Sequence, residues 1–257
     1  MELSLIIEDF QSKYADCFAI AGIFGGGNAA PWGDGVVGGN DNRIEHNRVS
    51  HVAFEAEDSG GFYTCGQDGT AMVNRGNVLA KNVFSFVAKD LTSLTTGGVY
   101  AIYFDDLMSG WTVVGNVIED SEFGILLGGG RDTTIEHNVF RRLSEDLPLV
   151  NASKGRAIYI DDRGTGGDKA LCSACNGSAC GLNSNYAVVA AALRNPEWAK
   201  YNISLVDPCV PRGIRIVCNE YCECGAGLYG VGGTTCPSCA LKIWGSTATN
   251  NFESDHC

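Results

Sequence analysis

Two pairs of adjacent aspartates, Asp105-Asp106 and Asp161-Asp162, have the residue type and the spacing for acid–base chemistry. Each pair ends a short segment that begins with Ala-Ile-Tyr, so the two pairs occupy the same place in two copies of one motif. Two carboxyl groups about 6.5–9.5 Å apart suit an inverting glycosidase, and about 5 Å suits a retaining one. We therefore predict that Asp105 and Asp161, or their neighbours Asp106 and Asp162, act as a catalytic acid and base.

The motif recurs along the chain, and such a period is typical of coils stacked on coils. The first three copies are each followed by a glycine-spaced run that ends in an asparagine and two apolar residues, and NRIEHNRV is an earlier copy of that run. The asparagines are Asn47, Asn82, Asn116 and Asn138, at intervals of 35, 34 and 22 residues. The motif copies are GFYTCGQD (61–68), AIYFDDLMSG (101–110), GILLGGGRD (124–132) and AIYIDDRG (157–164).

The elements that must position these residues are short strands. Each copy holds a β-branched segment bounded by Gly, Asn or Asp, too short for a hairpin with stable edges. Stacked in parallel, such segments cover each other's edges, and asparagines at the turns can bond to one another through their amides. A βαβ sheet is excluded because no helical period separates the strands; only Ala187–Lys200 is predicted as a helix. We predict an all-β fold, a right-handed parallel β-helix with a disulfide-rich C-terminal segment.

Aligning the first copies on their asparagines, and the last copy on its Ala-Ile-Tyr-x-Asp-Asp identity alone, predicts the register of the stacked strands. Asp105 and Asp161 fall in one column, together with Cys65 and with Leu127 or Gly128. Parallel strands lie about 4.7–4.9 Å apart, so the two aspartates are expected two layers apart, roughly 9–10 Å between their backbones. The layer between them belongs to a glycine triplet without side chains. We predict a groove with a glycine floor between carboxylate walls.

Further polar residues in the copies are candidates for substrate binding. Arg131 and Arg163 could orient a carboxylate or grip a substrate through their forked guanidinium groups. Tyr103 and Tyr159 could stack on sugar rings, and Asp68 extends the acidic wall by one layer. Each candidate has a structural alternative that stays open: Asp-Asp as a turn former, Arg-Asp as a salt-bridged turn, or a tyrosine packed in the core.

The sequence predicts no metal site apart from one conditional case. Glu57, Asp58 and Asp68 could supply oxygen ligands to Ca²⁺ if the reaction is that of a lyase. His46 and His137 each precede an asparagine of the repeat within Ile-Glu-His-Asn, a structural position. The two Cys-x2-Cys pairs are too far apart in sequence for a compact zinc finger. No other cofactor is predicted.

The net charge of −12 and the pI near 4.7 restrict the partners. Nucleic-acid backbones and anionic membranes need clustered Lys and Arg, so the composition argues against both. No run approaches the ~20 apolar residues of a membrane helix, so we expect no membrane insertion. We predict a monomer whose partner is a polysaccharide or another glycan.

Cysteines are dense in the C-terminal part, where all but two of the 12 lie from Cys172 onward. An even, dense set is typical of disulfides in an oxidising compartment. Asn-x-Ser sequons at Asn151, Asn176 and Asn202 agree with this, so we predict a secreted or cell-surface glycoprotein. The first residues, MELSLIIEDF, lack the form of a signal peptide, and we expect the chain to start inside a longer protein.

The chain is long enough for one sizeable core. We expect solenoid coils over 1–163, an excursion with a short helix over 164–213, and the last coils over 214–257. A Cys/Gly module at 218–239 is predicted as an insertion, and Leu241–Asn251 as a return to strand. A disulfide-stapled end is one way to cap a solenoid.

The series from GGFYTCGQD through YAIYFDDLMSG and GGGRDTTIEHNVF to AIYIDDRG resembles the right-handed β-helix-repeat proteins of the pectate-lyase-like superfamily. The segment from Trp198 to Gly213 is similar to the region after the DxRG copy in that group. The match spans about residues 35–220; it implies a β-helix and action on polysaccharide by hydrolysis or lyase-type cleavage. Where relatives carry Gly-Arg-Asp after the first Tyr-Thr, this chain has Cys65-Gly-Gln67-Asp68.

Three functions of different classes remain open. The first is a glycoside hydrolase with the paired aspartates as acid and base. The second is a polysaccharide lyase or epimerase in which Ca²⁺, or Arg131 or Arg163, neutralises a uronate. The third is a non-catalytic glycan-binding or cell-surface structural module.

Overall fold

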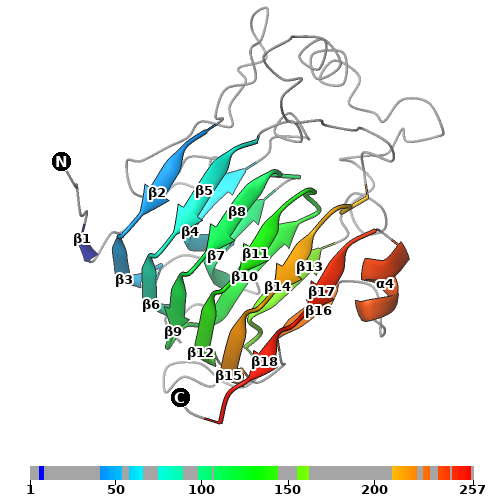
Figure 1. Ribbon diagram of the computed structural model, residues 1–257. Helices are drawn as coiled ribbons and strands as arrows, with labels where there is room; N and C mark the ends of the chain where they lie inside the picture. The colour runs from blue at the N-terminus through cyan, green and yellow to red at the C-terminus, as the bar shows by residue number, and fades with distance from the viewer. Residues whose placement is uncertain are drawn as a thin grey trace, which may run out of the picture.

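In the computed structural model, the described strands form three parallel sheets, which the chain visits in turn (Figure 1). Each coil contributes one strand to each sheet, and neighbouring strands in a sheet come from successive coils. The described residues are 6–8, 41–53, 58–65, 75–88, 98–105, 107–143, 155–161, 210–224, 228–231, 237–243 and 245–255.

All the described strand pairs are parallel. The seven-stranded sheet contains β1 (Ile6–Glu8), β3 (Arg48–Val52), β6 (Val83–Val87), β9 (Val117–Glu119), β12 (Val139–Leu143), β15 (Glu220–Cys224) and β18 (Phe252–Glu253). The six-stranded sheet contains β2 (Arg43–Glu45), β5 (Asn77–Ala80), β8 (Trp111–Val114), β11 (Thr134–Glu136), β14 (Arg215–Val217) and β17 (Thr247–Thr249). The five-stranded sheet contains β4 (Ser59–Cys65), β7 (Val99–Asp105), β10 (Phe123–Gly128), β13 (Ile158–Asp161) and β16 (Tyr229–Val231). This arrangement is a parallel β-helix, and it confirms the predicted all-β solenoid.

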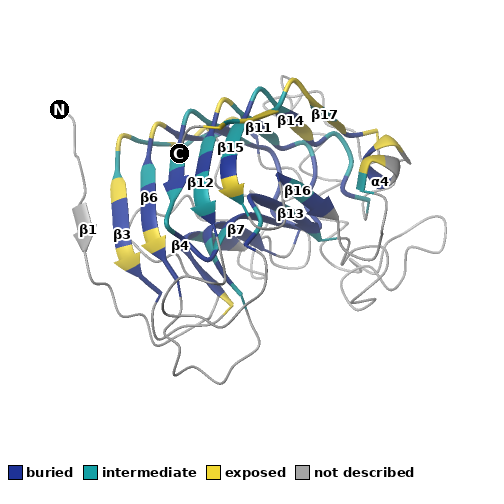
Figure 2. Ribbon diagram, turned by 90° about the horizontal axis from the view of Figure 1, so that it is seen from below, coloured by how far each residue is buried: buried dark blue, intermediate teal, exposed yellow. Residues whose placement is uncertain are grey.

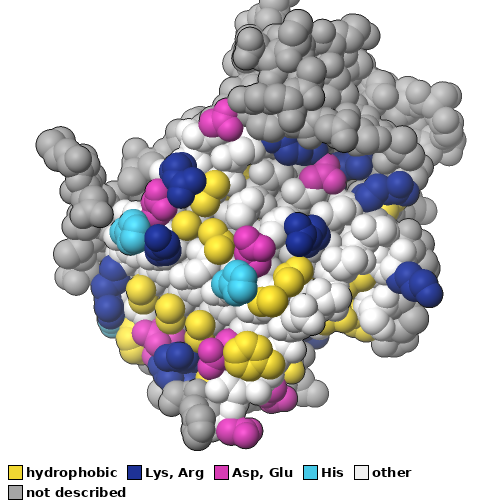
Figure 3. Space-filling view, in the orientation of Figure 1, with side chains coloured by type: hydrophobic (Ala, Val, Ile, Leu, Met, Phe, Trp, Pro, Cys, Tyr) yellow, Lys and Arg dark blue, Asp and Glu magenta, His cyan; other side chains and the backbone are white. Residues whose placement is uncertain are grey.

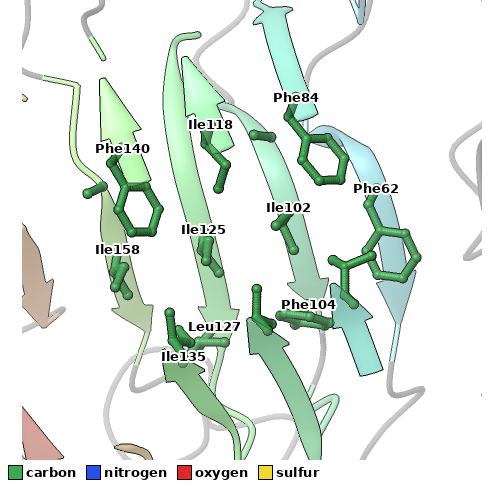
Figure 4. Packing of buried hydrophobic residues seen from close by; sticks show 14 of the residues in the cluster. Phe62, Phe84, Ile102, Phe104, Ile118, Ile125, Leu127, Ile135, Phe140 and Ile158 are labelled. Atoms are coloured by element: carbon green, nitrogen blue, oxygen red, sulfur yellow. The ribbon is translucent and has the colours of Figure 1, made fainter. Parts of the chain in front are cut away.

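The interior is filled by apolar side chains that stack in columns from coil to coil (Figure 4). Phe84, Ile118 and Phe140 form one such column, and each is at most 2% exposed. Ile102, Ile125 and Ile158 form another, on the five-stranded sheet. Burial of these columns, at about 25 cal/mol per Å² of apolar surface, drives the stacking. In Figure 2 the dark blue of buried residues is most continuous along strands of the five-stranded sheet such as β7, whereas strands of the other two sheets such as β15 and β17 are partly teal or yellow.

The predicted asparagine stack is present at the turn between the six- and seven-stranded sheets. In each rung, the backbone N–H and the side-chain amide of one asparagine donate to Oδ1 of the asparagine in the next coil, at 2.9–3.0 Å. The asparagine ladder continues beyond the four predicted asparagines and consists of Asn47, Asn82, Asn116, Asn138, Asn219 and Asn251.

Each ladder asparagine follows a residue with positive φ, which turns the chain from one sheet to the next. L-residues rarely adopt this left-handed conformation, and it persists here because packing and the ladder fix the turn. The predicted structural positions of His46 and His137 are thus explained by the turn. The column consists of His46, Lys81, Gly115, His137, Cys218 and Asn250.

Two glycines in the same coil are expected to differ in how much stability the protein loses when a side chain is added. A Cβ on Gly130 would lie 1.8 Å from the Met108 carbonyl oxygen, so Gly130→Ala should destabilise the protein by about 1–3 kcal/mol. Gly115 has φ of +64° and only Lys81 Cγ, at 3.8 Å, near a built Cβ. Asn adopts this conformation readily, so Gly115→Asn should change stability by less than about 0.5 kcal/mol. Urea denaturation midpoints of the two variants check this; equal midpoints would contradict the steric argument.

The C-terminal part departs from the sequence prediction in one segment. Residues 241–243 belong to the helix α4 (Pro237–Ile243), and the strand expected over Leu241–Asn251 is confined to β17. Leu241 and Ala240 are buried in the core cluster, so α4 places apolar side chains against the last coils instead of adding a strand there. The predicted Cys/Gly module at 218–239 contains β15 and β16, which are strands of the solenoid.

Several predictions fall outside the described residues. They include the helix over Ala187–Lys200 and the three sequons. Among the described cysteines, Cys222 is disulfide-bonded, whereas Cys218 and Cys224 are thiols. Burial raises the pKa of Cys224 to about 12. A disulfide-rich C-terminal segment stays a prediction. Within the described ranges, no helix is long and apolar enough to cross a membrane.

Candidate functional site

The two aspartates of the motif copies lie in one column of the five-stranded sheet, as the sequence alignment predicts. Cys65 pairs with Asp105, and Asp161 pairs with Gly128. Leu127 pairs with the residue before Asp105, which puts Gly128 beside Asp105 itself. The register therefore selects Gly128 from the two predicted alternatives, and Asp105 and Asp161 lie two strands apart with a glycine between them.

Both aspartates lie on the outer face of this sheet. Their strand neighbours Phe104 and Ile160 are fully buried in the core cluster, and successive side chains of a strand point to opposite faces. Two strand spacings separate the aspartate backbones by roughly 9–10 Å. Asp105 is 6% exposed and Asp161 is half-buried, so the two carboxylates have different surroundings.

Two tyrosines bind carboxylates across the first strands of this face. The Tyr63 hydroxyl donates to Asp105 Oδ2 at 2.6 Å, and the Tyr103 hydroxyl donates to Asp58 Oδ1 at 2.7 Å. Tyr63 and Tyr103 pair in the sheet register, and their rings meet edge to face with centroids 5.0 Å apart. The sequence left open whether Tyr103 packs in the core or lies on the outer face. In the structure Tyr103 lies on the outer face and is buried there.

The aromatic side chains continue along the same face. The Tyr100 ring lies 5.3 Å from that of Tyr103 and stacks on Phe123 at 5.0 Å. Burial raises the pKa of Tyr100, and the nearby Tyr159 and Asp161 raise it further. Carboxylates and aromatic rings thus share one surface over β7, β10 and β13, a combination suited to sugars, which present hydroxyls and apolar faces.

A cation lies at the far end of this face. The Arg156 guanidinium carbon is 5.4 Å from the centre of the Tyr159 ring, a cation–π arrangement. The same group lies where a side chain at Gly230 would be, because a Cβ there would come within 2.5 Å of it. Tyr159 pairs with Gly230 in the sheet, so Arg156 extends the aromatic column by one strand.

The remaining predicted site residues divide into two groups. Asp106, Asp162, Arg163 and Asp68 lie outside the described residues, as does Glu57. Arg131 is described, and its guanidinium lies at the turn between the five- and six-stranded sheets. There Arg131 Nε donates to Asp132 Oδ2 at 3.2 Å, and the side chain is 2% exposed.

Asp132 joins two buried arginines. Its Oδ2 also accepts from Arg75 Nη2, 57 residues earlier in the chain. Burial lowers the pKa of Arg75, whereas the Asp132 charge raises it. Arg131 therefore takes part in the salt-bridged turn that the sequence left open as its structural alternative.

The charge of Asp132 should contribute far more to the free energy of unfolding than the charge of Asp120, an aspartate in a similar turn. Asp132→Asn keeps the shape and the tolerated positive φ but removes the charge that the Arg75 and Arg131 side chains (10% and 2% exposed) both contact. We expect a loss of about 2–4 kcal/mol in the free energy of unfolding. Thermal and urea unfolding of the two proteins measure it.

Asp120→Asn is the matched control. Asp120 also has positive φ and pairs bidentately with Arg142 at 2.6 and 2.7 Å, but the Arg142 side chain is 36% exposed. Asp120→Asn should lower the free energy of unfolding by about 0–1 kcal/mol, and this difference should become smaller at high salt. Equal losses for the two variants would show that burial of the arginines does not decide the effect.

The described histidines, cysteines and carboxylates do not gather in groups of three that could hold a metal ion. Two of the three residues predicted for the Ca²⁺ alternative lie outside the described ranges, so that alternative stays a prediction. On the face of the six- and seven-stranded sheets, charges of both signs are mixed (Figure 3). The described carboxylate column belongs to the other sheet.

No family model, curated protein or solved structure matches this chain.

Sequence reasoning missed several residues of this face. Tyr63 was identifiable, because GFYTC aligns with AIYFD and puts Tyr63 in the column of Tyr103. Tyr100 and Phe123 precede the aligned motif cores, and Arg156 is marked by nothing in the repeat. Their positions depend on how the coils stack.

Proposed function

We propose that this protein is a secreted polysaccharide-active enzyme that hydrolyses glycosidic bonds with Asp105 and Asp161. The observation that carries the proposal is their shared column on the outer face, two strands apart, with Gly128 between them. A glycine at that place puts no side chain between the two carboxylates.

The separation favours inversion of the anomeric centre. Inverting enzymes hold their two carboxyl groups about 6.5–9.5 Å apart, so that a water molecule fits between the base and the sugar. The roughly 9–10 Å between the aspartate backbones is compatible with that range once the side chains lean toward the bond. One carboxyl group protonates the leaving oxygen while the other removes a proton from the attacking water.

Two further features support a carbohydrate substrate. Aromatic rings from β4, β7 and β10 lie beside the carboxylates, and such rings stack on the apolar faces of sugars. The motif copies resemble the pectate-lyase-like superfamily, and the proposal includes the right-handed winding of that group, the sense of nearly all parallel crossovers. Secretion is proposed from the cysteines and sequons.

The test is a panel of neutral and uronate glycans, incubated with the protein with and without EDTA. We expect new reducing ends from at least one glycan, unaffected by EDTA, and proton NMR of the first product should show the inverted anomer. An absorbance rise from unsaturated uronate, lost with EDTA, would support a Ca²⁺-assisted lyase instead. Binding without any product would support a glycan-binding or structural module.

A further inference from the structure

One hydrogen bond of Asp105 comes from a position of the repeat that holds a different residue beside Asp161. Asp105 accepts a hydrogen bond from Tyr63, which lies on the preceding strand β4, two residues before the partner of Asp105 in the register. The same place relative to Asp161 is on β10, and it is occupied by Leu126. Leucine has no donor, so the repeat supplies a tyrosine for one aspartate and not for the other.

The Tyr63 hydroxyl is held in place by its neighbours. Its ring meets Tyr103 at an interplanar angle of 72°, and Tyr103 is 3% exposed. Tyr103 is fixed in turn by its bond to Asp58 and by the ring of Tyr100. A phenol packed in this way has little rotational freedom, so it fixes the orientation of the carboxylate that it contacts.

We propose that Tyr63 is a positioning residue for Asp105, and that this contact makes Asp105 the base and Asp161 the acid. The inference rests on the proposed hydrolysis. An ionised carboxylate can only accept hydrogen bonds, and a donor held against it favours the ionised form. Its two oxygens offer about four lone-pair positions, so the bond to Tyr63 leaves acceptor capacity for a water molecule.

The step balances with these two residues and water. Asp161 gives its proton to the glycosidic oxygen as the bond from that oxygen to the anomeric carbon breaks. Asp105 takes a proton from water while the water oxygen bonds to the anomeric carbon from the opposite face. The products are two shorter chains, an ionised Asp161 and a protonated Asp105, and exchange with solvent restores both groups.

The test compares Tyr63→Phe, Asp105→Asn and Tyr221→Phe on the glycan of the panel that gives most reducing ends. Tyr63→Phe should lower kcat by about tenfold, the value of one hydrogen bond to a charged group, with KM little changed. Tyr221 bonds to Glu253 on the seven-stranded sheet, so Tyr221→Phe should behave as wild type.

The assignment of acid and base has a second readout. On an aryl glycoside of the same sugar with a dinitrophenolate leaving group, Asp161→Asn should keep most of the activity, because that group leaves without a proton. Asp105→Asn should stay inactive there. The reverse pattern would overturn the assignment.

The outcomes separate the two proposals. If Asp105→Asn abolishes activity while Tyr63→Phe matches wild type in kcat, the role of Tyr63 is wrong and hydrolysis stands. If no glycan is cleaved, or Asp105→Asn is fully active, the proposed hydrolysis is wrong and the role of Tyr63 falls with it.

Discussion

Replacing Asn138 by alanine is expected to lower the free energy of unfolding by about 3–5 kcal/mol. The Asn138 side chain is fully buried in the asparagine ladder. Its Nδ2 donates to Asn219 Oδ1 at 3.0 Å and to the Val113 carbonyl at 2.9 Å, and its Oδ1 accepts from the backbone and side-chain amides of Asn116. Alanine removes all of these bonds at once.

The size of the effect follows from the groups that remain. Each buried donor or acceptor left without a partner costs about 1–3 kcal/mol, more than the roughly 0.5–1.5 kcal/mol that an ordinary hydrogen bond contributes. Asn138→Ala takes the acceptor from the two amides of Asn116 and a donor from the Val113 carbonyl and from Asn219 Oδ1, all in a buried site. Urea denaturation, followed by circular dichroism and analysed with a common m-value, measures the loss.

Asn47→Ala is the control at the first rung of the ladder. Asn47 is half-buried, donates to Asn82 Oδ1 at 2.9 Å, and its own Oδ1 has no partner among the described residues. Only the donor side of the rung is lost, so we expect about 1 kcal/mol. If the two variants lose the same free energy, the interior rungs do not hold the coils as argued.

Asp105→Asn and Asp161→Asn are each expected to lower kcat/KM by about 10²–10⁴ on the glycan that the panel identifies. Asparagine has nearly the same shape as aspartate but neither donates an acidic proton nor removes one from water. The change therefore tests proton transfer and not packing. The double variant should be little worse than either single one, because acid and base act in one step.

Asp120→Asn provides the control for activity, since Asp120 follows β9 on the seven-stranded sheet. Its kcat/KM should equal that of wild type. Circular dichroism of all variants separates loss of chemistry from loss of fold. Full activity in both Asp105→Asn and Asp161→Asn would contradict the role proposed for the pair.

Much of the solenoid could be predicted because its coils repeat short local sequence patterns. Asn47, Asn82, Asn116 and Asn138 predicted the ladder, and the shared Ala-Ile-Tyr-x-Asp-Asp pattern of two copies put Asp105 and Asp161 in one column. The next interval, from Asn138 to Asn219, spans 81 residues. No regular interval predicts Asn219 as a ladder residue. Only the expected return of the coil at Ile214, after the long excursion, indicated that the stacking continues there.

Other features were beyond the sequence because they depend on contacts between coils. The segment before β17 forms α4, where Leu241 packs against the core, although a strand was expected there. The contact of Arg75 with Asp132 joins residues 57 positions apart, and that of Tyr63 with Asp105 joins residues 42 apart. Neither contact recurs between the corresponding residues of every copy, so the sequence repeat does not predict it.

The sequence by itself determined the parallel β-helix, four asparagines of the ladder and the column that holds Asp105 and Asp161, but it left Leu127 and Gly128 as alternatives for the place between them. It could do so because parallel strands pair residue by residue, and a repeat of turns and apolar positions therefore fixes which backbones lie side by side. Only the tertiary structure decided that Tyr63 bonds to Asp105 and that Arg131 turns to Asp132. Those partners are chosen by rotamers and turn conformations between layers, which packing sets after the register is fixed.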